Sequence, residues 1–467
     1  MKPFFKKVFF ILLISFSFLA CSSNTNKAAV KTEPNLEKGK VIDKVSCKKD
    51  LSTNYALYLP SKYDSTKKYP VIIAFDSHAC GTKPVNLFKD EAEKYGYIVV
   101  GSNNSKNGTA WPTTNAIYNA MLTDVLERFS IDKKRIYTAG FSGGSRVAST
   151  IAIQNGGIAG VVGFSAGFPG INQPISNKFD FLGIVGNADF NFNEMTQLDK
   201  YLESVKFVHY LLVFNGKHEW PSQEIIPDVF SWLEFCAMRN KWTNLNNVVI
   251  NEFTGKYAKE IENKKAKNDI YGEYLICEKI VRFLDGVGPI DVYKTRLTEL
   301  QKTPAVQNEL KAIETDVNKE QTLQENYSKA MNTNDEKWWT AEVKKINDII
   351  KQNKNVRECL IYKRIFSFLS IGAYTYSNNA LKSNQLSEAQ RFITIYTLVD
   401  PENSETAYFQ AILYARKNEN EKAMKSLEDA VNLGFNDVGR MQADTSISKL
   451  TSMKEYYQLI DKMKAKK

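Results

Sequence analysis

Short apolar runs alternate with longer amphipathic stretches between residues 41 and 240. Helices are predicted over Ala116–Phe129 and Ser145–Gln154, with Gly, Pro, Asn and Asp at the joints between the segments. Strands that are apolar throughout and separated by helices favour a parallel sheet covered on both faces. The pattern therefore predicts an α/β fold with a mostly parallel, doubly wound sheet over 41–240. The expected strands are Tyr55–Leu59, Val71–Phe75, Ile98–Gly101, Arg135–Ala139, Gly160–Phe164, Phe181–Val185 and Tyr210–Phe214.

The pattern changes after Trp242, where strand-like runs disappear and Lys, Glu, Asn and Gln dominate. Residues 256–284, 290–316 and 335–352 are predicted helices of moderate amphipathicity, whereas 316–334 are polar enough for a loop or a weak helix. We therefore expect an all-α part of the chain. It divides into a helical region over 241–370 and helical repeats over 371–467.

A repeat marks the C-terminal part of the chain. Ala373-Tyr374 recurs as Ala407-Tyr408, and Ala389 as Ala423, each 34 positions later. Small residues at such points let paired helices approach closely, and a period of this length resembles the tetratricopeptide repeat. Because such units need about three copies to bury a continuous face, the helices before residue 371 are expected to supply further neighbours. The alternative is a plain helical bundle with accidental spacing.

The beginning of the chain has the pattern of an export signal. Lys2, Lys6 and Lys7 precede the apolar run Val8–Ala20, which is followed by Cys21. This resembles a bacterial lipoprotein signal, and the resemblance implies removal of residues 1–20 and lipidation of Cys21. The polar stretch that follows is expected to tether the protein, over 21–40, to the cell envelope at the outer membrane or the periplasmic face. The alternative is an ordinary secretory signal.

Composition narrows the classes of function. The 467 residues suggest two or three domains, and 43% apolar with 24% charged residues exclude wholesale disorder. Lys and Arg number 62 against 52 Asp and Glu, a net charge of +10, of which three lysines lie in the predicted leader. A surplus that small does not predict nucleic-acid binding. With three histidines and no C-x-x-C motif, no metal site and no cofactor are expected. Five cysteines follow Cys21, so an odd thiol remains whatever disulfides form.

Two segments match the G-x-S-x-G pattern, one around Ser142 and one around Ser165. A nucleophile elbow needs a strand before the serine and a helix directly after it. Ser142 follows a predicted strand and precedes a predicted helix, whereas Phe168-Pro169-Gly170 prevents an immediate helix after Ser165. We therefore predict Ser142 as the nucleophile, and we place Ser165 at the end of the next strand, near the site but without a role.

The order of the chain suggests the partners of that serine. His209 lies in the alternating run Phe207–Leu212, where a strand position is expected, and His78 precedes the serine. His218, on a loop after a late strand, is therefore the predicted base. Asp189 is the first carboxylate after the intervening strand and is the predicted acid. Weaker acid candidates are Asp180, which precedes that strand, and Asp199 and Glu194, which lie near the next helix. The order Ser142, Asp189, His218 is that of an α/β-hydrolase.

Residues 41–240 resemble α/β-hydrolase esterases related to polyhydroxybutyrate depolymerases and feruloyl esterases. The segments that carry the resemblance are Tyr55–Pro60, Ser77–Gly81, Gly140–Gly144 and Lys217–Pro221. The resemblance implies an oxyanion hole made by the backbone N–H of Gly143 and that of Ala79 or Cys80. Ala79 stands where the family has a glycine, so this donor departs from the family pattern.

These observations predict a lipid-anchored serine hydrolase that cleaves carboxylic esters of a small molecule or a polymer. A serine peptidase on the same fold is the alternative within enzymes, since a triad does not separate esters from amides. An inert binding lipoprotein that works through its helical repeats is the alternative outside enzymes. The repeats are expected to bind a protein partner or to shape access to the site. Candidate cleft aromatics are Trp111, Phe190, Phe192 and Trp220, of which half are expected to be packing residues.

Overall fold

The computed structural model describes residues 36–170, 175–352 and 354–465. The predicted leader over 1–20, the predicted lipidation site Cys21 and most of the predicted tether lie outside the described residues. Within the described ranges, no helix combines the length and the apolar character needed to cross a membrane.

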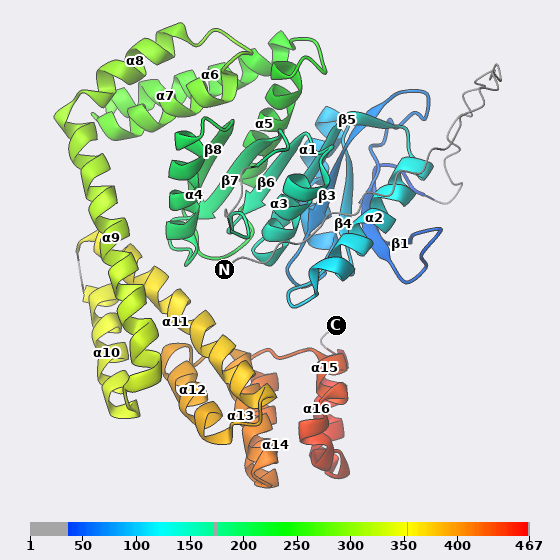
Figure 1. The fold of residues 1–467 in the computed structure, drawn as a ribbon, viewed down its shortest axis with the longest axis vertical. Helices are drawn as coiled ribbons and strands as arrows, with labels where there is room; N and C mark the ends of the chain where they lie inside the picture. The colour runs from blue at the N-terminus through cyan, green and yellow to red at the C-terminus, as the bar shows by residue number, and fades with distance from the viewer. Residues whose placement is uncertain (1–35, 171–174, 353, 466–467) are drawn as a thin grey trace, which may run out of the picture.

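Eight strands form a single sheet in the order β1-β2-β4-β3-β5-β6-β7-β8 (Figure 1). β2 pairs antiparallel with β1 and β4, and every pair from β4 to β8 is parallel. The predicted mostly parallel α/β fold is confirmed, although β1 was not among the predicted strands. The strands are β1 (Val41–Ser46), β2 (Asn54–Tyr58), β3 (Tyr69–Phe75), β4 (Ile98–Ser102), β5 (Ile131–Phe141), β6 (Gly160–Phe164), β7 (Asp180–Gly186) and β8 (His209–Phe214).

Helices cover both faces of the sheet, as the apolar strands require. On one face, α1 (Thr82–Tyr95) and α5 (Ile226–Arg239) bury their apolar sides in a cluster with the strands. On the other face, α2 (Trp111–Arg128), α3 (Gly143–Asn155) and α4 (Phe192–Ser204) do the same in a second cluster. The carboxyl ends of β3 to β8 thus meet at one edge between two packed layers, where open parallel sheets place their ligands.

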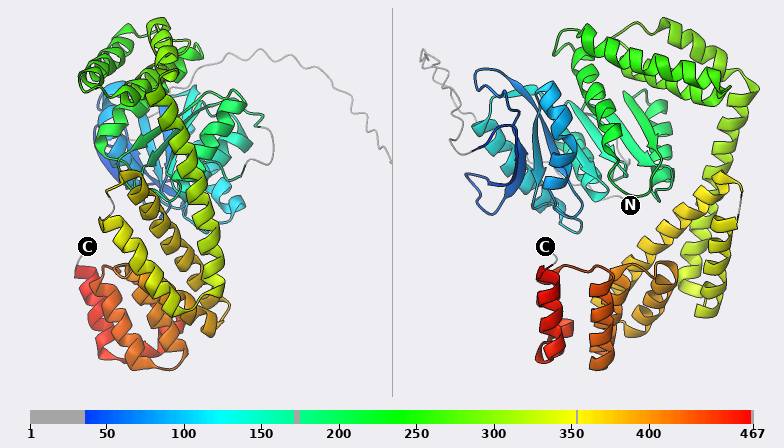
Figure 2. Two further views of the ribbon diagram at one scale, coloured as in Figure 1. Left: turned by 90° about the vertical axis from the view of Figure 1, so that its left-hand side faces the viewer. Right: turned by 180° about the vertical axis from the view of Figure 1, so that it is seen from behind.

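The rest of the described chain is helical. Figures 1 and 2 show α6, α7 and α8 beside the top of the sheet, α9 running down from them to α10, and the later helices below. Short 3₁₀ turns lie at Gln223–Ile225 (η1) and Thr445–Ser452 (η2). The helices are α6 (Asn247–Ala266), α7 (Ile270–Leu284), α8 (Asp291–Gln301), α9 (Pro304–Thr333), α10 (Glu336–Gln352), α11 (Val356–Lys382), α12 (Leu386–Val399), α13 (Ser404–Arg416), α14 (Asn420–Asn432), α15 (Val438–Ala443) and α16 (Lys454–Ala465).

Three helix predictions in this part were wrong. Residues 290–316 are not one helix, because α8 ends at Gln301 and Thr303 caps the start of α9. Residues 256–284 are not one helix, because the chain turns at Asn268 (φ +52°) and Asp269 accepts a hydrogen bond from the Gly272 N–H as the cap of α7. Residues 316–334 are not a loop or a weak helix: nearly all of them belong to α9, a helix of 30 residues. Tyr327, Ala330 and Met331 anchor its last turns in an apolar cluster, which compensates for the polar remainder of the segment.

Apolar packing does not follow the predicted boundary at residue 241. The cluster on the α1 and α5 face of the sheet continues through α6, α7 and α8 as far as Val306 at the start of α9. A separate cluster then extends from Tyr327, late in α9, to Met463 in α16. α9 therefore joins the two apolar clusters, and the domain division stays a prediction.

The predicted 34-residue period appears in the structure as two helical hairpins. α11 packs on α12, and α13 packs on α14, with turns at Asn384 and Asn418 whose φ angles are +54° and +61°. Ala389 and Ala423, at matching places in the second helix of each hairpin, are both fully buried. Their small side chains allow close helix contacts. Membership of the tetratricopeptide family stays a prediction.

Candidate active site

Ser142 occupies a sharp turn between β5 and α3. Its backbone angles, φ 55° and ψ −121°, lie outside the regions that side chains prefer, and such strain is concentrated at functional positions. The flanking glycines make the turn possible. A Cβ on Gly140 would lie 2.2 Å from the Gly144 carbonyl oxygen, and one on Gly144 would lie 2.1 Å from that of Phe75. This strand–serine–helix geometry is that of a nucleophile elbow.

Asp189 and His218 are brought to the same edge by neighbouring strands, β7 and β8. His218 Nε2 lies 2.9 Å from Ser142 Oγ. His218 Nδ1 lies 2.9 Å from Asp189 Oδ1 and 3.1 Å from Oδ2. The Asp189 side chain is fully buried, whereas that of His218 is 21% exposed. The structure thus places the three residues predicted from the chain order in one continuous hydrogen-bonded series.

This geometry defines what each group can do. With Nδ1–H donating to the Asp189 carboxylate, Nε2 carries the lone pair and accepts the hydrogen bond from the Ser142 hydroxyl. The Asn191 N–H also donates to Asp189 Oδ1 at 2.8 Å, which holds the carboxylate in place. A serine, a base and an orienting acid in this arrangement can carry out nucleophilic catalysis.

Aromatic rings flank the imidazole of His218. The rings of Phe190 and Phe141 lie 4.2 Å and 4.9 Å, centroid to centroid, from that of His218, and Trp220 stacks on Phe141 at 5.4 Å. Of the four predicted cleft aromatics, Phe190 and Trp220 therefore lie beside the site. Trp111 and Phe192 instead pack into the apolar cluster on the α2 to α4 face of the sheet.

The loop after β3 is tied to the histidine loop by a buried carboxylate. Asp76 accepts hydrogen bonds from the His78 N–H at 2.9 Å and from Trp220 Nε1–H at 2.9 Å. Burial alone would raise the pKa of Asp76, but hydrogen bonds involving His78 and Trp220 outweigh burial and lower it to about 2. The hydrogen bond with Asp76 in turn raises the pKa of His78, whose side chain is exposed. Asp76 therefore stays ionised and links the two loops.

The two predicted alternatives for the second oxyanion donor differ in this loop. Ala79 has a φ of +59°, a conformation in which glycine is much less strained, in keeping with the glycine of the resembling family. Its N–H donates to the Asp76 carbonyl oxygen at 3.1 Å and is thus already used. Among the hydrogen bonds of the described chain, none uses the Cys80 N–H. Gly143 is the first residue of α3, where a helix leaves N–H groups without an internal acceptor.

Asn107 also lies at this site, although no pattern in the sequence predicted it. Its N–H donates to the Ser77 carbonyl oxygen at 2.9 Å, and His78 forms a β-bridge with Lys106. A Cβ on Gly143 would lie 1.8 Å from Asn107 Oδ1, so the amide rests against the turn that carries the serine. An asparagine in a polar loop between β4 and α2 gives no signal of this contact in the sequence.

Ser165 and His209 lie where the sequence analysis placed them. Ser165 follows the end of β6, is fully buried, and its hydroxyl has no hydrogen-bond partner among the described residues. His209 is the first residue of β8, and its Nε2 lies 3.2 Å from Asp199 Oδ1.

Asp180 begins β7, at the opposite end of the strand from Asp189, and pairs with Arg239. Glu194 pairs with Arg146 at 2.7 Å.

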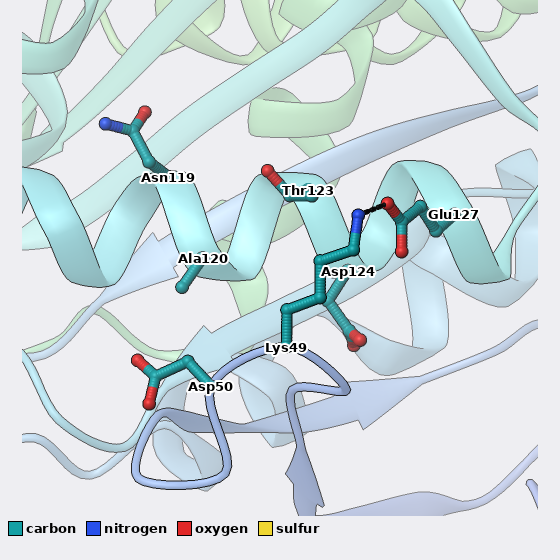
Figure 3. A pocket seen from close by; sticks show the side chains of 7 residues that line it. All are labelled: Lys49, Asp50, Asn119, Ala120, Thr123, Asp124 and Glu127. Atoms are coloured by element: carbon teal, nitrogen blue, oxygen red, sulfur yellow. Dashed lines mark hydrogen bonds and ion pairs between the residues drawn. The ribbon is translucent and has the colours of Figure 1, made fainter.

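Two cavities lie away from Ser142. One, of about 240 Å³, opens between the turn at Lys49 and Asp50 and the α2 helix, where Lys49 pairs with Glu127 (Figure 3). The other, of about 290 Å³, lies beside β8 and includes His209 and Glu278. Burial raises the pKa of Glu278 to about 6. Within the described ranges, no group of three or more His, Cys, Asp or Glu side chains is placed to hold a metal ion.

Comparisons with known proteins returned structural matches alone. No family model matches the chain, and no curated protein matches its sequence. The S-formylglutathione hydrolase FrmB from Staphylococcus aureus is 17% identical, with 39% of this chain and 90% of that chain covered and a TM-score of 0.33. A mutant of the feruloyl esterase module from Clostridium thermocellum, complexed with sinapinate, is 16% identical, with 43% and 89% covered and a TM-score of 0.35. FphF, a fluorophosphonate-binding serine hydrolase of Staphylococcus aureus, is 15% identical, with 42% and 97% covered and a TM-score of 0.34.

Proposed function

We propose that this protein is a serine hydrolase that cleaves carboxylic esters through an acyl-enzyme. The observation that carries the proposal is the series Ser142 Oγ–His218 Nε2 at 2.9 Å and His218 Nδ1–Asp189 Oδ1 at 2.9 Å, built on a strained elbow. Strain and three aligned polar groups at one sheet edge are costly for a protein to maintain without a function. An inert fold would not require them.

In the first half of the reaction, Ser142 Oγ attacks the ester carbonyl carbon while His218 Nε2 takes the hydroxyl proton. Asp189 holds the imidazole in the required tautomer and stabilises the imidazolium that forms. His218 then gives the proton to the departing alcohol oxygen as the carbon–oxygen bond breaks. The products of this half are the free alcohol and an acyl ester on Ser142.

Water releases the acid in the second half. His218 takes a proton from water as the water oxygen attacks the acyl carbon, and the proton returns to Ser142 Oγ when the acyl group leaves. The negative oxygen of both tetrahedral intermediates is stabilised by the N–H groups of Gly143 and Cys80. We assign Cys80 rather than Ala79 because the Ala79 N–H already donates to the backbone carbonyl oxygen of Asp76. Each such donor contributes about 3 kcal/mol in comparable sites.

The location and the helical repeats are part of the same proposal. A lipid on Cys21 anchors the protein in the bacterial cell envelope, which the pattern of Lys2, Lys6 and Lys7 before an apolar run and a cysteine supports. Incorporation of a labelled fatty acid that is lost in Cys21→Ser tests this part. The paired helices after residue 371 resemble tetratricopeptide repeats and are proposed to bind a protein partner.

Hydrolysis by the full chain tests the activity. The substrates are nitrophenyl esters of short acids, a feruloyl ester and a peptide anilide, and the variants are Ser142→Ala, His218→Ala and Ser165→Ala. We expect ester cleavage, a loss of at least about 10³-fold in Ser142→Ala and His218→Ala, and little change in Ser165→Ala, which has the same motif without the site. Faster cleavage of the anilide would indicate a peptidase. A folded parent without activity on any substrate would contradict the proposal.

A further inference from the structure

The helical part of the chain contacts the loop that carries Asp189. α11 packs along α9, and α9 packs against α4, the helix that begins just after this loop. Figures 1 and 2 show that α9 passes the side of the sheet formed by β8 and that α11 crosses α9. Asn193 Nδ2 donates to the Val317 carbonyl oxygen of α9 at 3.4 Å. At this place α9 and α11 reach the acid loop of the candidate active site.

Arg364, on α11, makes the principal contact there. Its Nη1 donates to the Asn187 carbonyl oxygen at 2.7 Å, across 177 positions of the sequence. Its Nε donates to Glu320 Oε2 of α9 at 2.7 Å. Its guanidinium lies 4.6 Å from the centroid of the Phe192 ring. Three groups from two regions thus fix one planar side chain, and the side chains of Arg364 and Glu320 are 6% and 0% exposed.

Asn187 joins the loop of Asp189 to the loop of His218. Its N–H donates to the Phe214 carbonyl oxygen at 2.8 Å, and its Oδ1 accepts from the Gly216 N–H at 3.3 Å. The Gly216 carbonyl oxygen accepts from the next residue in the acid loop, Ala188, at 2.9 Å. Asp189 is two residues after Asn187 and His218 is two residues after Gly216. A shift of the Asn187 peptide would therefore move both loops.

The planar fork of N–H donors on Arg364 makes the contact directional. A buried ion pair contributes little net stability, because desolvation of both charges offsets their attraction. A guanidinium with a fixed fork of donors is instead well suited to hold two acceptors at set positions. Burial raises the pKa of Glu320, while Arg364 opposes that shift. The Arg364–Glu320 pair therefore adds little to the stability of the contact between α9 and α11, but it holds the Asn187 carbonyl group in a fixed position.

We propose that Arg364 is a positioning residue for the hydrolysis: it fixes the Asn187 peptide and thereby the Asp189–His218 geometry. The inference rests on the proposed function. It makes the helical part a component of the catalytic unit. A displacement of about 1 Å in a catalytic group can cost about 100-fold in rate. Loss of the Arg364 contact is therefore expected to lower kcat by about 10- to 100-fold and to change KM little.

The variant Arg364→Met/Glu320→Gln tests this in the full chain. The pair of changes removes the Asn187 contact without leaving a buried charge unpaired. Arg357→Ala is the matched control: Arg357 lies two turns earlier on α11 and pairs with Glu309 and Asp316 of α9, so it joins the same two helices. Arg364→Lys keeps the charge but not the fork, and an intermediate kcat is expected from it.

Two readouts separate positioning from simple loss of folded protein. The first is kcat per active site, with the sites counted by a fluorophosphonate. The second is the low-field proton resonance of the His218 Nδ1–H bonded to Asp189, assigned by its absence in His218→Gln. We expect lower kcat and a broadened or shifted resonance in Arg364→Met/Glu320→Gln, with neither change in Arg357→Ala. A resonance unchanged in Arg364→Met/Glu320→Gln would overturn the inference, whether or not the parent is active. A parent that lacks activity, but whose resonance changes in this variant, would contradict the proposed function alone.

Discussion

The sheet-bearing part and the helical part of this chain place polar groups in different ways. In the sheet, polar side chains gather at one edge because parallel strands end together, so Ser142, Asp189 and His218 follow β5, β7 and β8. In the helical part, an apolar cluster runs from Tyr327 to Met463. The site is thus formed by residues at the ends of strands, whereas α9 and α11 contact α4 and the loop of Asp189 from the side.

Two buried carboxylates, one in each part, are held by different kinds of partner. Asp76, in the sheet-bearing part, accepts hydrogen bonds from a backbone N–H and an indole N–H, and its pKa falls to about 2. Glu320, in the helical part, has Arg364 as its charged partner, and burial still raises its pKa. The first arrangement stabilises the ionised acid. In the second arrangement, burial disfavours the ionised form of Glu320, and Arg364 opposes this effect.

The largest effect is expected from a methyl group at the elbow. In Gly144→Ala, the new Cβ would lie 2.1 Å from the Phe75 carbonyl oxygen, which backbone pairing holds in place. We expect a loss of about 3 kcal/mol in the free energy of unfolding, measured by urea denaturation. Gly255→Ala, on α6, is the matched change in the helical part, where no atom lies within 4 Å of the new Cβ. A gain of about 0.5–1 kcal/mol is expected there. Equal effects at both positions would contradict the comparison.

A smaller effect, dependent on pH, is expected at Asp76. Because its folded pKa is about 2 against an ordinary 3.8, the ionised group contributes about 2 kcal/mol of stability. That contribution is complete above about pH 5 and is lost as the pH falls from about 4 to 2. Asp76→Asn should therefore be less stable than the parent at pH 7 and nearly equal to it near pH 2. A difference that persists unchanged at pH 2 would show that the charge of Asp76 is not responsible.

The smallest effect is expected at the left-handed turn of Ala79. Ala79→Gly relieves the strain of a φ of +59° and should raise the free energy of unfolding by about 1 kcal/mol. Asn384→Gly is the counterpart in the helical part, at a φ of +54°. Asparagine tolerates this conformation better than alanine, so a gain of a few tenths of a kcal/mol is expected there. A larger gain at Asn384 than at Ala79 would contradict this explanation.

Much of the sheet-bearing part could be predicted from local patterns. Most of the predicted strands are runs of apolar residues long enough to cross a covered sheet. β1 was missed because Asp43 and Lys44 interrupt its pattern at the edge of the sheet. The G-x-S-x-G spacing around Ser142 is typical of a nucleophile elbow, because the flanking glycines allow its sharp turn. With three histidines in the chain, the order of the elements brought forward His218 and Asp189, which the structure places within hydrogen-bonding distance of each other.

What could not be predicted depends on partners that are distant in the sequence. The polar stretch within α9 is helical because its last turns pack on other helices and Glu320 meets Arg364, 44 positions later. The contact of Arg364 with Asn187 and that of Asn107 with Gly143 depend on tertiary placement. Until the fold is known, Arg364 and Asn107 are indistinguishable from solvent-exposed residues.

The role of Ser142 as the nucleophile is tested by the position at which a fluorophosphonate reacts with the protein. The full chain is labelled, digested and analysed by mass spectrometry, with His218→Ala and Ser165→Ala treated in the same way. We expect one adduct, on Ser142, which persists in Ser165→Ala and is nearly absent in His218→Ala. An adduct on a different serine, or a folded parent that does not react, would contradict the assignment of Ser142 as an activated nucleophile.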